Sequence, residues 1–418
     1  MMKTYQINSA FIIFSVFFLL SCSLFGNDSE DSKNNSDFVQ VDDASMVVSG
    51  DKFHVAGTNA YYLPNYQLID SSVVNRALDL FEESDIRAVR MWAFYDGPPI
   101  YQNDNSIQPQ PRQYNENSLI ALDQVIAKGK EKGIYFILPF INYWSELGGI
   151  EVYNGWCGES GRNMSAFINN QECQSIFKDY VSMLLNRVNT VTGIAYKDEP
   201  AIMLWEIGNE LRNPEGSAEE LRDWYQDIAQ FIKSIDSKHL VATGEEGFDD
   251  ASLGEFTGNG SFVHPYYTSS DYANTYVLRA DQGTSYVLNT QIPEIDVASA
   301  HWYPDVFGFG LQLDDELNTA QAAWLRDHQA IANDLGKPFI LGEYGLPGWG
   351  SEDVLNNYND VWSLSENLEI GGTLLWQLTA DYVKCWEFGG NICWPAGRED
   401  EALYTNFEQH IETMNSIR

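Results

Sequence analysis

Eight short apolar segments recur along this chain, and they restrict the folds open to it more than any other feature. They lie at residues 53–59, 87–92, 134–140, 201–207, 239–244, 296–302, 338–344 and 372–378. Continuous apolar runs of this length are typical of strands buried on both faces, as in a parallel sheet covered by helices. The sequence therefore predicts a parallel sheet of eight strands.

Amphipathic segments lie between most of these runs and predict the helices that would cover such a sheet. The segment 71–84 begins with a Ser suited to an N-cap, and the segment 117–133 ends in Lys and Gly, a C-terminal signature. Further segments lie at 173–193, 217–236, 319–336, 352–367 and 403–417. The alternation predicts a closed (β/α)8 TIM barrel in the α/β class, entered through an N-terminal β-hairpin. An open doubly wound sheet would need a glycine-rich phosphate turn after its first strand, and "AGTNAYY" is not such a turn.

The charge balance of the chain argues against some classes of partner. Its 418 residues include 24 Lys and Arg against 60 Asp and Glu, which gives a net charge of −36. Such a surface repels phosphate backbones and anionic lipid head groups. We therefore expect no nucleic acid partner and no membrane docking through basic residues. A neutral polysaccharide would meet little repulsion.

The first 38 residues are expected to lie outside the fold. Lys3 and the apolar run 11–20 are typical of a signal peptide, because the run is too short to span a bilayer. The run ends in "LLSC", which resembles a bacterial lipobox, so residues 1–21 would be removed and Cys22 lipidated. Residues 22–38 would form a flexible tether to a barrel domain at 39–418. We expect an outer-membrane lipoprotein, or otherwise a secreted protein cut by an ordinary signal peptidase.

Four cysteines remain in the chain after Cys22. Export to an oxidising compartment favours disulfides, and four cysteines allow three pairings. We expect the two local pairs, Cys157–Cys173 and Cys385–Cys393, because they close short loops. No Cys-x-x-Cys or paired His spacing supports a zinc site, so we expect no metal.

Polar or aromatic residues stand at the end of every predicted strand. In a barrel of this kind the active site lies at the C-terminal ends of the strands. The residues found there are Asn59, Arg90, Asn142 with Trp144, Asn209 with Glu210, Glu245 with Glu246, His301 with Tyr303, Glu343, and Trp376. One such residue alone is more often a structural ion pair than a catalytic group. Eight strand ends facing one rim indicate an active site.

Several of these motifs together resemble glycoside hydrolase family 5. They are "VRMW", "WEIGNE", "HWYP" and "GEYG", and the resemblance covers about residues 46–418. The segments "FHVAGTNAYYL", "NYWSELGGIEVYNGW", "VNTVTGIAYKDEPAIMLWEIGNELR" and "GEEGF" resemble the family's endo-β-1,4-mannanase branch. The resemblance implies a retaining hydrolase that cuts mannan, glucomannan or galactomannan internally, without a cofactor and as a monomer. The chain departs from many relatives in having Leu211, where they have Pro, after the acid.

The resemblance also implies a role for each candidate residue. Glu210 would be the acid/base and Glu343 the nucleophile, and strands four and seven would bring them together across the rim. Retention requires two carboxyls about 5–5.5 Å apart. Arg90 and Tyr303 would hold Glu343, and Asn209 would bind the sugar 2-hydroxyl. The remaining substrate-binding residues would be His301 near the acid, Trp376 as the stacking floor, and Trp144 and Arg212 on the leaving-group side.

Two acidic features are expected to be structural. Glu206 lies inside a strand, so we expect it to bond with neighbours within the barrel. The segment "GEEGFDD" at 244–250 lacks the alternating spacing of a calcium loop, so a solvated turn is the expectation and a Ca²⁺ site the alternative. Glu246 in this segment could instead reach a distal sugar.

Three other functions stay open at this level. A β-1,4-glucanase or an exo-β-mannosidase would use the same two glutamates. A lipoprotein that binds polysaccharide without cutting it would need neither Glu210 nor Glu343, nor the groups around them. The presence of the whole set favours an enzyme.

Overall fold

The computed structural model describes residues 37–98, 106–249, 255–256, 262–263, 280–304, 315–346, 352–380, 394–395 and 402–418. Cys22, the apolar run 11–20 and the pair Cys385 and Cys393 lie outside the described residues. Within the described part of the chain, no helix is both long enough and apolar enough to cross a membrane.

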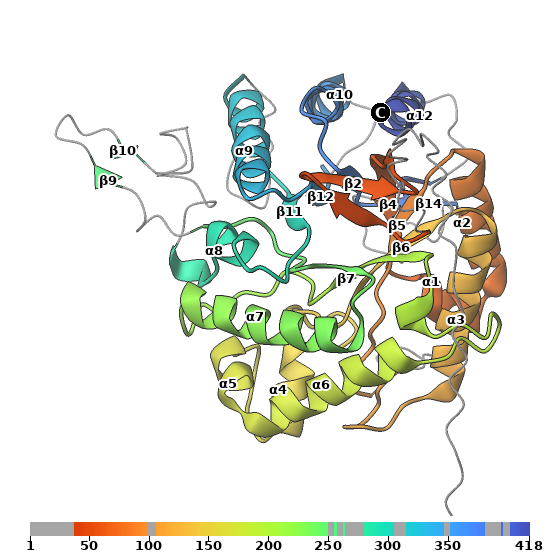
Figure 1. Cartoon of the computed structure of the whole chain (residues 1–418), viewed down its shortest axis with the longest axis vertical. Coiled ribbons are helices and arrows are strands. Elements are labelled where there is room, and N and C mark those ends of the chain that lie inside the picture. The colour runs from red at the N-terminus through yellow and green to blue at the C-terminus, as the bar shows by residue number, and fades with distance from the viewer. Residues whose placement is uncertain are drawn as a thin grey trace, which may run out of the picture. The chain divides into compact units, whose positions relative to one another are not determined.

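Eight parallel strands form the centre of the fold, as predicted (Figure 1). Along the sheet they run in the order β11, β12, β13, β4, β5, β6, β7, β8. Their bounds are β4 (Val55–Asn59), β5 (Ala88–Arg90), β6 (Tyr135–Pro139), β7 (Ile202–Glu206), β8 (Leu240–Ala242), β11 (Ala298–Trp302), β12 (Phe339–Tyr344) and β13 (Gly372–Leu375). Seven of the eight strands are buried at every residue, and β6 is buried except for the half-buried Tyr135 at its start, which explains their continuous apolar sequences.

Hydrogen bonds between the two end strands close the sheet into a barrel. The backbone N–H groups of Asp296 and Val297, just before β11, donate to the carbonyl of Val241 in β8 at 2.8 and 3.3 Å. The N–H of Gly244 donates to the hydroxyl of Ser299 at 3.0 Å. The barrel therefore has no open edge at this seam.

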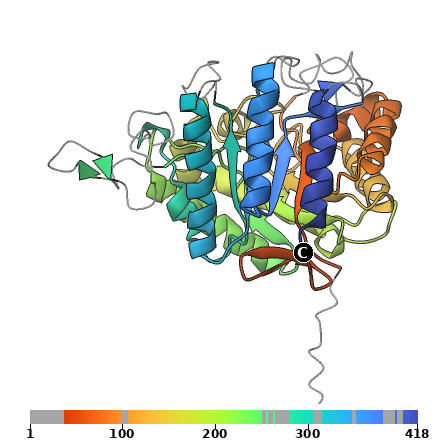
Figure 2. The same ribbon diagram turned by 90° about the horizontal axis from the view of Figure 1, so that it is seen from above.

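Helices surround the barrel, and α9, α10 and α12 stand side by side along its outside (Figure 2). The longer helices are α2 (Ser71–Glu83), α3 (Glu116–Glu131), α6 (Gln171–Asn186), α7 (Ala218–Ile235), α9 (Asp315–Asp334), α10 (Glu352–Asn367) and α12 (Ala402–Ser416). Short helices that the sequence analysis did not predict are α1 (Leu63–Ile69), α4 (Ile150–Trp156), α5 (Met164–Asn169) and α8 (Tyr286–Thr290). The described residues also include two-stranded pairs of β9 (Glu255–Phe256) with β10 (Phe262–Val263), and β14 (Leu378–Thr379) with β15 (Trp394–Pro395).

The predicted helix at 173–193 was wrong at its end, because α6 stops at Asn186. Beyond it, the side-chain oxygen of Asn189 accepts hydrogen bonds from the backbone N–H groups of Val191 and Thr192 at 2.8 and 3.1 Å. Such local side-chain bonds compete with helical hydrogen bonding. The chain therefore leaves the helix and enters a loop before β7.

A small antiparallel sheet covers the N-terminal end of the barrel. Its strands are β1 (Gln40–Asp42), β2 (Ser45–Val48) and β3 (Asp51–Lys52), and it extends the predicted hairpin by one strand. Met46 of β2 is buried in one apolar cluster with Val55 and Leu374 of the barrel. The opposite, C-terminal end of the barrel carries the polar residues of the rim.

The loop between α6 and β7 is built around one buried carboxylate, that of Asp123 in α3. It accepts hydrogen bonds from two nitrogens of Arg187 at 2.8 and 2.7 Å, from the Tyr196 hydroxyl at 2.6 Å, and from the N–H and hydroxyl of Thr190 at 3.0 and 2.8 Å. Burial opposes ionisation, but these donors outweigh it and hold the pKa of Asp123 below its usual value. The segment "VNTVTGIAYKDEP" therefore serves the stability of the barrel rather than its rim.

We predict that Asp123→Asn lowers the free energy of unfolding by about 3–5 kcal/mol at neutral pH, because it breaks a buried ion pair. Since the folded pKa of Asp123 is depressed, the difference should be full above the unfolded pKa near 3.9 and shrink as the pH falls through the folded value. Urea unfolding at several pH values measures it. Asp198→Asn, which breaks the exposed pair with Lys238, is the matched control and should cost about 0–1 kcal/mol. Equal effects of the two variants would contradict the account.

Candidate active site

Arg90 at the end of β5 is the central cation of the rim. Its side chain is fully buried and donates four hydrogen bonds. They go to Glu206 at 2.7 Å, Asn59 at 3.1 Å, Glu343 at 2.6 Å and Asn209 at 2.7 Å. Burial disfavours a charge there, but Glu206 and Glu343 outweigh it and raise the pKa of Arg90. One guanidinium therefore fixes side chains from the strands β4, β7 and β12 and from the turn after β7.

Glu206 is one of the two acidic partners of Arg90. It lies in β7 and is buried, and one of its carboxylate oxygens accepts from Nε of Arg90 at 2.7 Å. This agrees with its expected bonding to neighbours inside the barrel. Glu206 offsets part of the charge of Arg90, so the guanidinium can hold Glu343 without a net positive charge in the core.

Glu343 in β12 has both carboxylate oxygens held by donors. Arg90 donates to Oε1 at 2.6 Å and the hydroxyl of Tyr303 donates to Oε2 at 2.6 Å. Burial and the nearby carboxylates raise the pKa of Tyr303 well above its usual value, so its hydroxyl stays protonated and able to donate. A carboxylate held in this way by two donors has a fixed direction, as a nucleophile requires.

Glu210 lies just beyond β7 in an unusual backbone conformation. Its φ is +55°, a left-handed value that costs an L-residue with a long side chain roughly 1–2 kcal/mol. Its N–H donates to the carbonyl of Gly244 at 2.8 Å. A Cβ at Gly244 would lie 2.0 Å from the carbonyl oxygen of Gly208, so only glycine allows this approach. The strained turn directs the Glu210 side chain into the centre of the rim.

Two donors hold the Glu210 carboxylate. Nε1 of Trp144 donates to Oε2 at 2.5 Å, and Nδ1 of His301 donates to Oε1 at 2.7 Å. Its side chain is 12% exposed, whereas His301 is fully buried. Glu210, His301 and Glu343 each offer a polar atom within 4.8 Å of the others. The two carboxylates that the sequence singles out therefore come close together, with an imidazole between them.

Glu210, His301 and Glu343 are close enough for each to change the pKa of the others. Burial would lower the pKa of His301, but Glu343 and Glu210 outweigh it and raise the pKa. Burial also opposes ionisation of Glu210, yet hydrogen bonds from His301 and Trp144 hold its pKa below the usual value. Burial and the charge of Glu210 raise the pKa of Glu343. One proton therefore lies in the short bond between Glu210 and His301, and the directions of these two shifts place it on the imidazole.

Asn209 is held between the rim and the barrel. Its side-chain oxygen accepts from Arg90, and its side-chain nitrogen donates to Oδ1 of Asn142 at 3.0 Å. The same oxygen of Asn142 accepts from the N–H of Trp144 at 3.2 Å. Asn142 thus joins the loop after β6 to the turn after β7, a role that sequence reasoning did not assign to it.

Trp376 follows β13 and is partly exposed. It stacks against Tyr61 with ring centroids 5.6 Å apart and planes 5° from parallel. The stacking support from Tyr61 was not foreseen, since only its place two residues after β4 could have suggested it. The backbone N–H of Trp376 donates to the carbonyl of Tyr344, the residue after Glu343, at 2.9 Å. A flat, partly exposed ring next to this strand is suited to contact the face of a sugar.

Arg212 and Glu246 form a buried pair at the edge of the rim. Nε and Nη2 of Arg212 donate to the two oxygens of Glu246, each at 2.5 Å. Burial and the charge of Glu210 raise the pKa of Glu246 to about 8. Arg212 occupies both oxygens of Glu246, so in this structure Glu246 orients Arg212 instead of extending freely toward a ligand.

The prediction of a solvated turn at 244–250 was wrong for residues 244–249, the part that the structure describes. Glu245, Glu246 and Asp249 are all buried. Glu245 accepts hydrogen bonds from Thr243 at 2.9 Å and from Asn289 at 3.1 and 3.0 Å, and burial raises its pKa to about 8. These carboxylates bind neighbouring side chains, among them residues of the distant segment around α8. The oxygens of these carboxylates accept hydrogen bonds from hydroxyl, amide and guanidinium groups. The calcium alternative therefore gains no support.

Glu210, His301 and Glu343 are also near enough to one another to ligate a metal ion. However, Arg90 already neutralises Glu343, and Tyr303 and Trp144 donate to the two carboxylates. A cation would have to compete with these donors. The arrangement fits proton transfer and nucleophilic attack better than metal binding.

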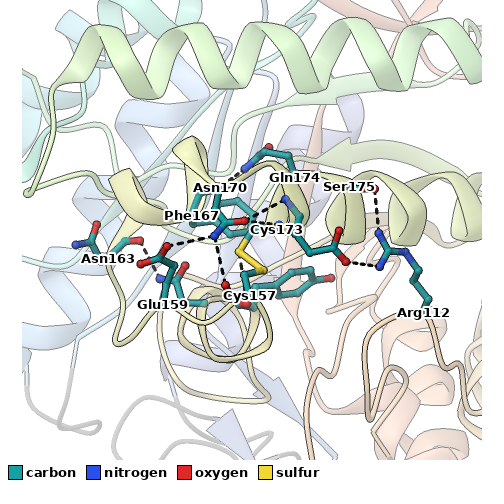
Figure 3. The surroundings of a disulfide bond; sticks show 12 residues. Arg112, Cys157, Glu159, Asn163, Phe167, Asn170, Cys173, Gln174 and Ser175 are labelled. Atoms are coloured by element: carbon teal, nitrogen blue, oxygen red, sulfur yellow. Dashed lines mark hydrogen bonds and ion pairs between the residues drawn. A yellow bond between two sulfur atoms is a disulfide. The ribbon is translucent and has the colours of Figure 1, made fainter.

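The structure contains the expected disulfide between Cys157 and Cys173, which joins the end of α4 to the start of α6 (Figure 3). The carbonyl of Cys157 and the carboxylate of Glu159 accept from the side chain of Asn170 at 3.4 and 3.2 Å. This crosslinked segment lies in the chain directly after the loop that carries Trp144.

Comparison with known proteins identifies the family. A model described as GH family 5 beta-mannosidase-like matches residues 36–277, more than half of the chain. Mannan endo-1,4-beta-mannosidase 5 of Solanum lycopersicum is 31% identical over 92% of this chain and 91% of its own length. The chain belongs to glycoside hydrolase family 5.

Other comparisons agree with this family 5 hydrolase. Mannan endo-1,4-beta-mannosidase 3 of Arabidopsis thaliana is 33% identical over 87% of this chain and 88% of its own. The endo-1,4-beta-mannanase of Rhizomucor miehei superposes with a TM-score of 0.75 at 28% identity, covering 90% of this chain and 99% of its own. A model of the TIM barrel domain of glycosyl hydrolases family 2 also matches residues 158–397, in line with the barrel described above.

We predict a bell-shaped dependence of kcat/KM on pH for this hydrolase. As the pH falls, protonation of Glu343 should remove activity at a pKa above its ordinary value of 4.5. As the pH rises, loss of the proton shared by Glu210 and His301 should remove it at a pKa above 6.5. In His301→Asn the alkaline limb should move to lower pH, because a carboxyl alone gives up its proton more readily than an imidazole. An unchanged alkaline limb in that variant would contradict the shared proton.

We predict that Tyr303→Phe lowers kcat/KM about 10- to 150-fold, the loss expected for one hydrogen bond to a charged group. The acid limb should move to higher pH, because the lost donor normally lowers the pKa of Glu343. Initial rates from pH 4 to pH 9 measure both effects. Tyr66→Phe, on α1 away from the carboxylates, is the control. A loss of rate without a shift of the acid limb would mean that Tyr303 serves only packing.

Proposed function

We propose that this protein is a retaining endo-1,4-β-mannanase that cleaves internal bonds of mannan, glucomannan or galactomannan. The observation that carries the mechanism is the pair Glu210 and Glu343, whose nearest polar atoms lie within 4.8 Å of each other. Retaining glycosidases hold their carboxyls about 5–5.5 Å apart, while inverting ones need about 6.5–9.5 Å to admit a water. The spacing supports double displacement.

In the first step, Glu343 attacks the anomeric carbon and forms a glycosyl ester, while the leaving oxygen takes a proton from Glu210. Arg90 and Tyr303 keep Glu343 ionised and directed toward the carbon. The proton that Glu210 donates is the one that it shares with His301. The positive charge that develops on the sugar ring lies between two carboxylates, which stabilise it.

In the second step, water attacks the same carbon and Glu210 takes its proton as a base. Glu343 leaves as a carboxylate, and Arg90 again stabilises its charge. The product keeps the β configuration after the two inversions. Asn209, fixed by Arg90 and Asn142, would donate to the sugar 2-hydroxyl, and Trp376 would stack beneath the ring.

The names of the relatives support the substrate. The tomato and Arabidopsis relatives are mannan endo-1,4-beta-mannosidases, and the Rhizomucor miehei structure is an endo-1,4-beta-mannanase. A β-1,4-glucanase would use the same carboxylates with a different pocket for the 2-hydroxyl. The similarity to an exo-β-1,4-mannosidase of an Opitutaceae bacterium, at 14% identity, concerns the fold alone.

We also propose that the protein is exported, lipidated at Cys22 and held at the outer membrane as a monomer. The support is the sequence of the leader, with its short apolar run and "LLSC". Secretion in free form is the alternative. Labelling of the protein with a radioactive fatty acid in the wild type and in Cys22→Ala decides between them.

We predict that the purified protein releases short manno-oligosaccharides from mannan and glucomannan, but none from carboxymethyl-cellulose or xylan. Glu343→Ala should lower the rate at least about 1,000-fold, because the nucleophile is lost. Product sizing by chromatography measures the pattern, and proton NMR of the first product should show the β anomer. Mannose alone would mean exo action. Cleavage of cellulose but not mannan would contradict the proposed substrate. Polymer binding without any products would contradict the proposed enzymatic activity.

A further inference from the structure

Arg162 is a charged residue outside the assigned set that contacts the ring of Trp144, a partner of the acid/base. Its guanidinium carbon lies 4.7 Å from the centre of the Trp144 ring and 5.3 Å from that of Tyr143. Arg212 lies over the same Trp144 ring at 5.0 Å. A guanidinium over an indole face is attracted to it by the electrostatics of the ring. Trp144 is thus held by two cations.

The backbone around Arg162 is fixed. The side chain of Asn154, which is fully buried, donates to the carbonyls on both sides of Arg162, those of Gly161 and Asn163, each at 2.9 Å. The side chain of Asn163 caps α5 through the N–H of Ala166 at 2.8 Å. The disulfide Cys157–Cys173 closes the segment that contains Arg162 (Figure 3). A loop tied down at these points presents its side chain in a set position.

Arg162 has no carboxylate partner among the described residues, although the chain carries 60 acidic side chains. By contrast, Arg112 binds Glu172 and Asp179 on α6 at 2.7 and 2.6 Å. The described contacts of the Arg162 guanidinium are therefore with aromatic rings.

The indole that Arg162 covers acts on the reaction directly. Nε1 of Trp144 donates to Oε2 of Glu210 at 2.5 Å, and the side chain of Trp144 is partly exposed on a loop. Without a fixed ring plane, this N–H would not point steadily at Glu210. The ring position is therefore a condition for the hydrogen bond.

We propose that Arg162 is a positioning residue for the acid/base: it holds the Trp144 indole in the orientation in which its N–H reaches Glu210. This inference rests on the proposed function, in which Glu210 gives and takes the proton. Arg162 would act through Trp144 and need not touch the sugar. The disulfide-closed segment would thereby set the protonation of the active site.

Other charged groups also act on Glu210, and the test must separate them from Arg162. They are His301 on β11, Glu343 on β12, Arg90 on β5, Arg212 after β7 and Glu246 after β8. All five of these residues are retained in the Arg162 variants. A double-mutant cycle with Trp144 isolates the part of the effect that passes through the indole.

The first readout needs no turnover. The pKa of Glu210 is followed through the carbon-13 resonance of its carboxyl, assigned with Glu210→Gln. We expect Arg162→Ala to raise this pKa by about 0.5 to 1.5, the range set by the strength of a cation–π contact. In the Trp144→Phe background, where the indole N–H is absent, Arg162→Ala should cause no further change.

The second readout is kcat/KM on manno-oligosaccharides across pH. Arg162→Ala should lower it about 2- to 30-fold and shift the alkaline limb in the same direction as the titration. Arg112→Ala, which removes the neighbouring arginine without contact to Trp144, should leave both readouts at wild-type values. If Arg162→Ala folds poorly, Arg162→Lys is tested in its place. The Lys ammonium cannot stack flat on the indole as a guanidinium does, so this variant should show most of the same pKa shift.

The outcomes separate this inference from the proposed function. An equal change of pKa in both backgrounds would overturn the proposal, since Arg162 would then act by its charge alone. No change in either background would also overturn it. A wild-type protein that releases no manno-oligosaccharides would defeat the proposed function instead, while the titration would still decide the role of Arg162.

Discussion

The buried guanidinium of Arg90 is the interaction on which the rest of the site depends. It joins Glu206, Asn59, Asn209 and Glu343, which lie on three strands of the barrel and on the turn after one of them. A single buried cation with four polar partners cannot move without leaving several of them unpaired. The barrel brings these strands to one rim, and Arg90 fixes their side chains relative to one another. The nucleophile is therefore oriented by the core of the fold rather than by a loop.

Much of this arrangement could be predicted from the sequence. The strands are buried on both faces, so each appears as an apolar run, and a polar residue at its end is exceptional enough to notice. Glu210 and Glu343 were found in this way, together with Arg90, His301 and Tyr303. The expectation that Glu206 bonds inside the barrel also agrees with the structure.

Other features depend on contacts between distant segments, which a single sequence does not reveal. Glu245 and Glu246 look like a solvated acidic turn, but their partners are Asn289, far along the chain, and Arg212. Helix α6 ends early because the Asn189 side chain binds backbone N–H groups that would otherwise bond within the helix. The apolar periodicity of the sequence does not reveal this. The support that Trp376 receives from Tyr61 arises only when the first and last strands of the barrel lie side by side.

The central claim is that Glu343 attacks the sugar as the nucleophile, while Glu210 acts as the general acid and then as the general base. Trapping the intermediate tests it most directly. A 2-deoxy-2-fluoro-β-mannobiosyl fluoride slows the second step, so the glycosyl ester should accumulate, and peptide mapping by mass spectrometry locates it. The account predicts one label on Glu343 within "LGEYG" and none in Glu343→Gln. A label on Glu210 or Glu206, or steady turnover to the α anomer without any label, would contradict it.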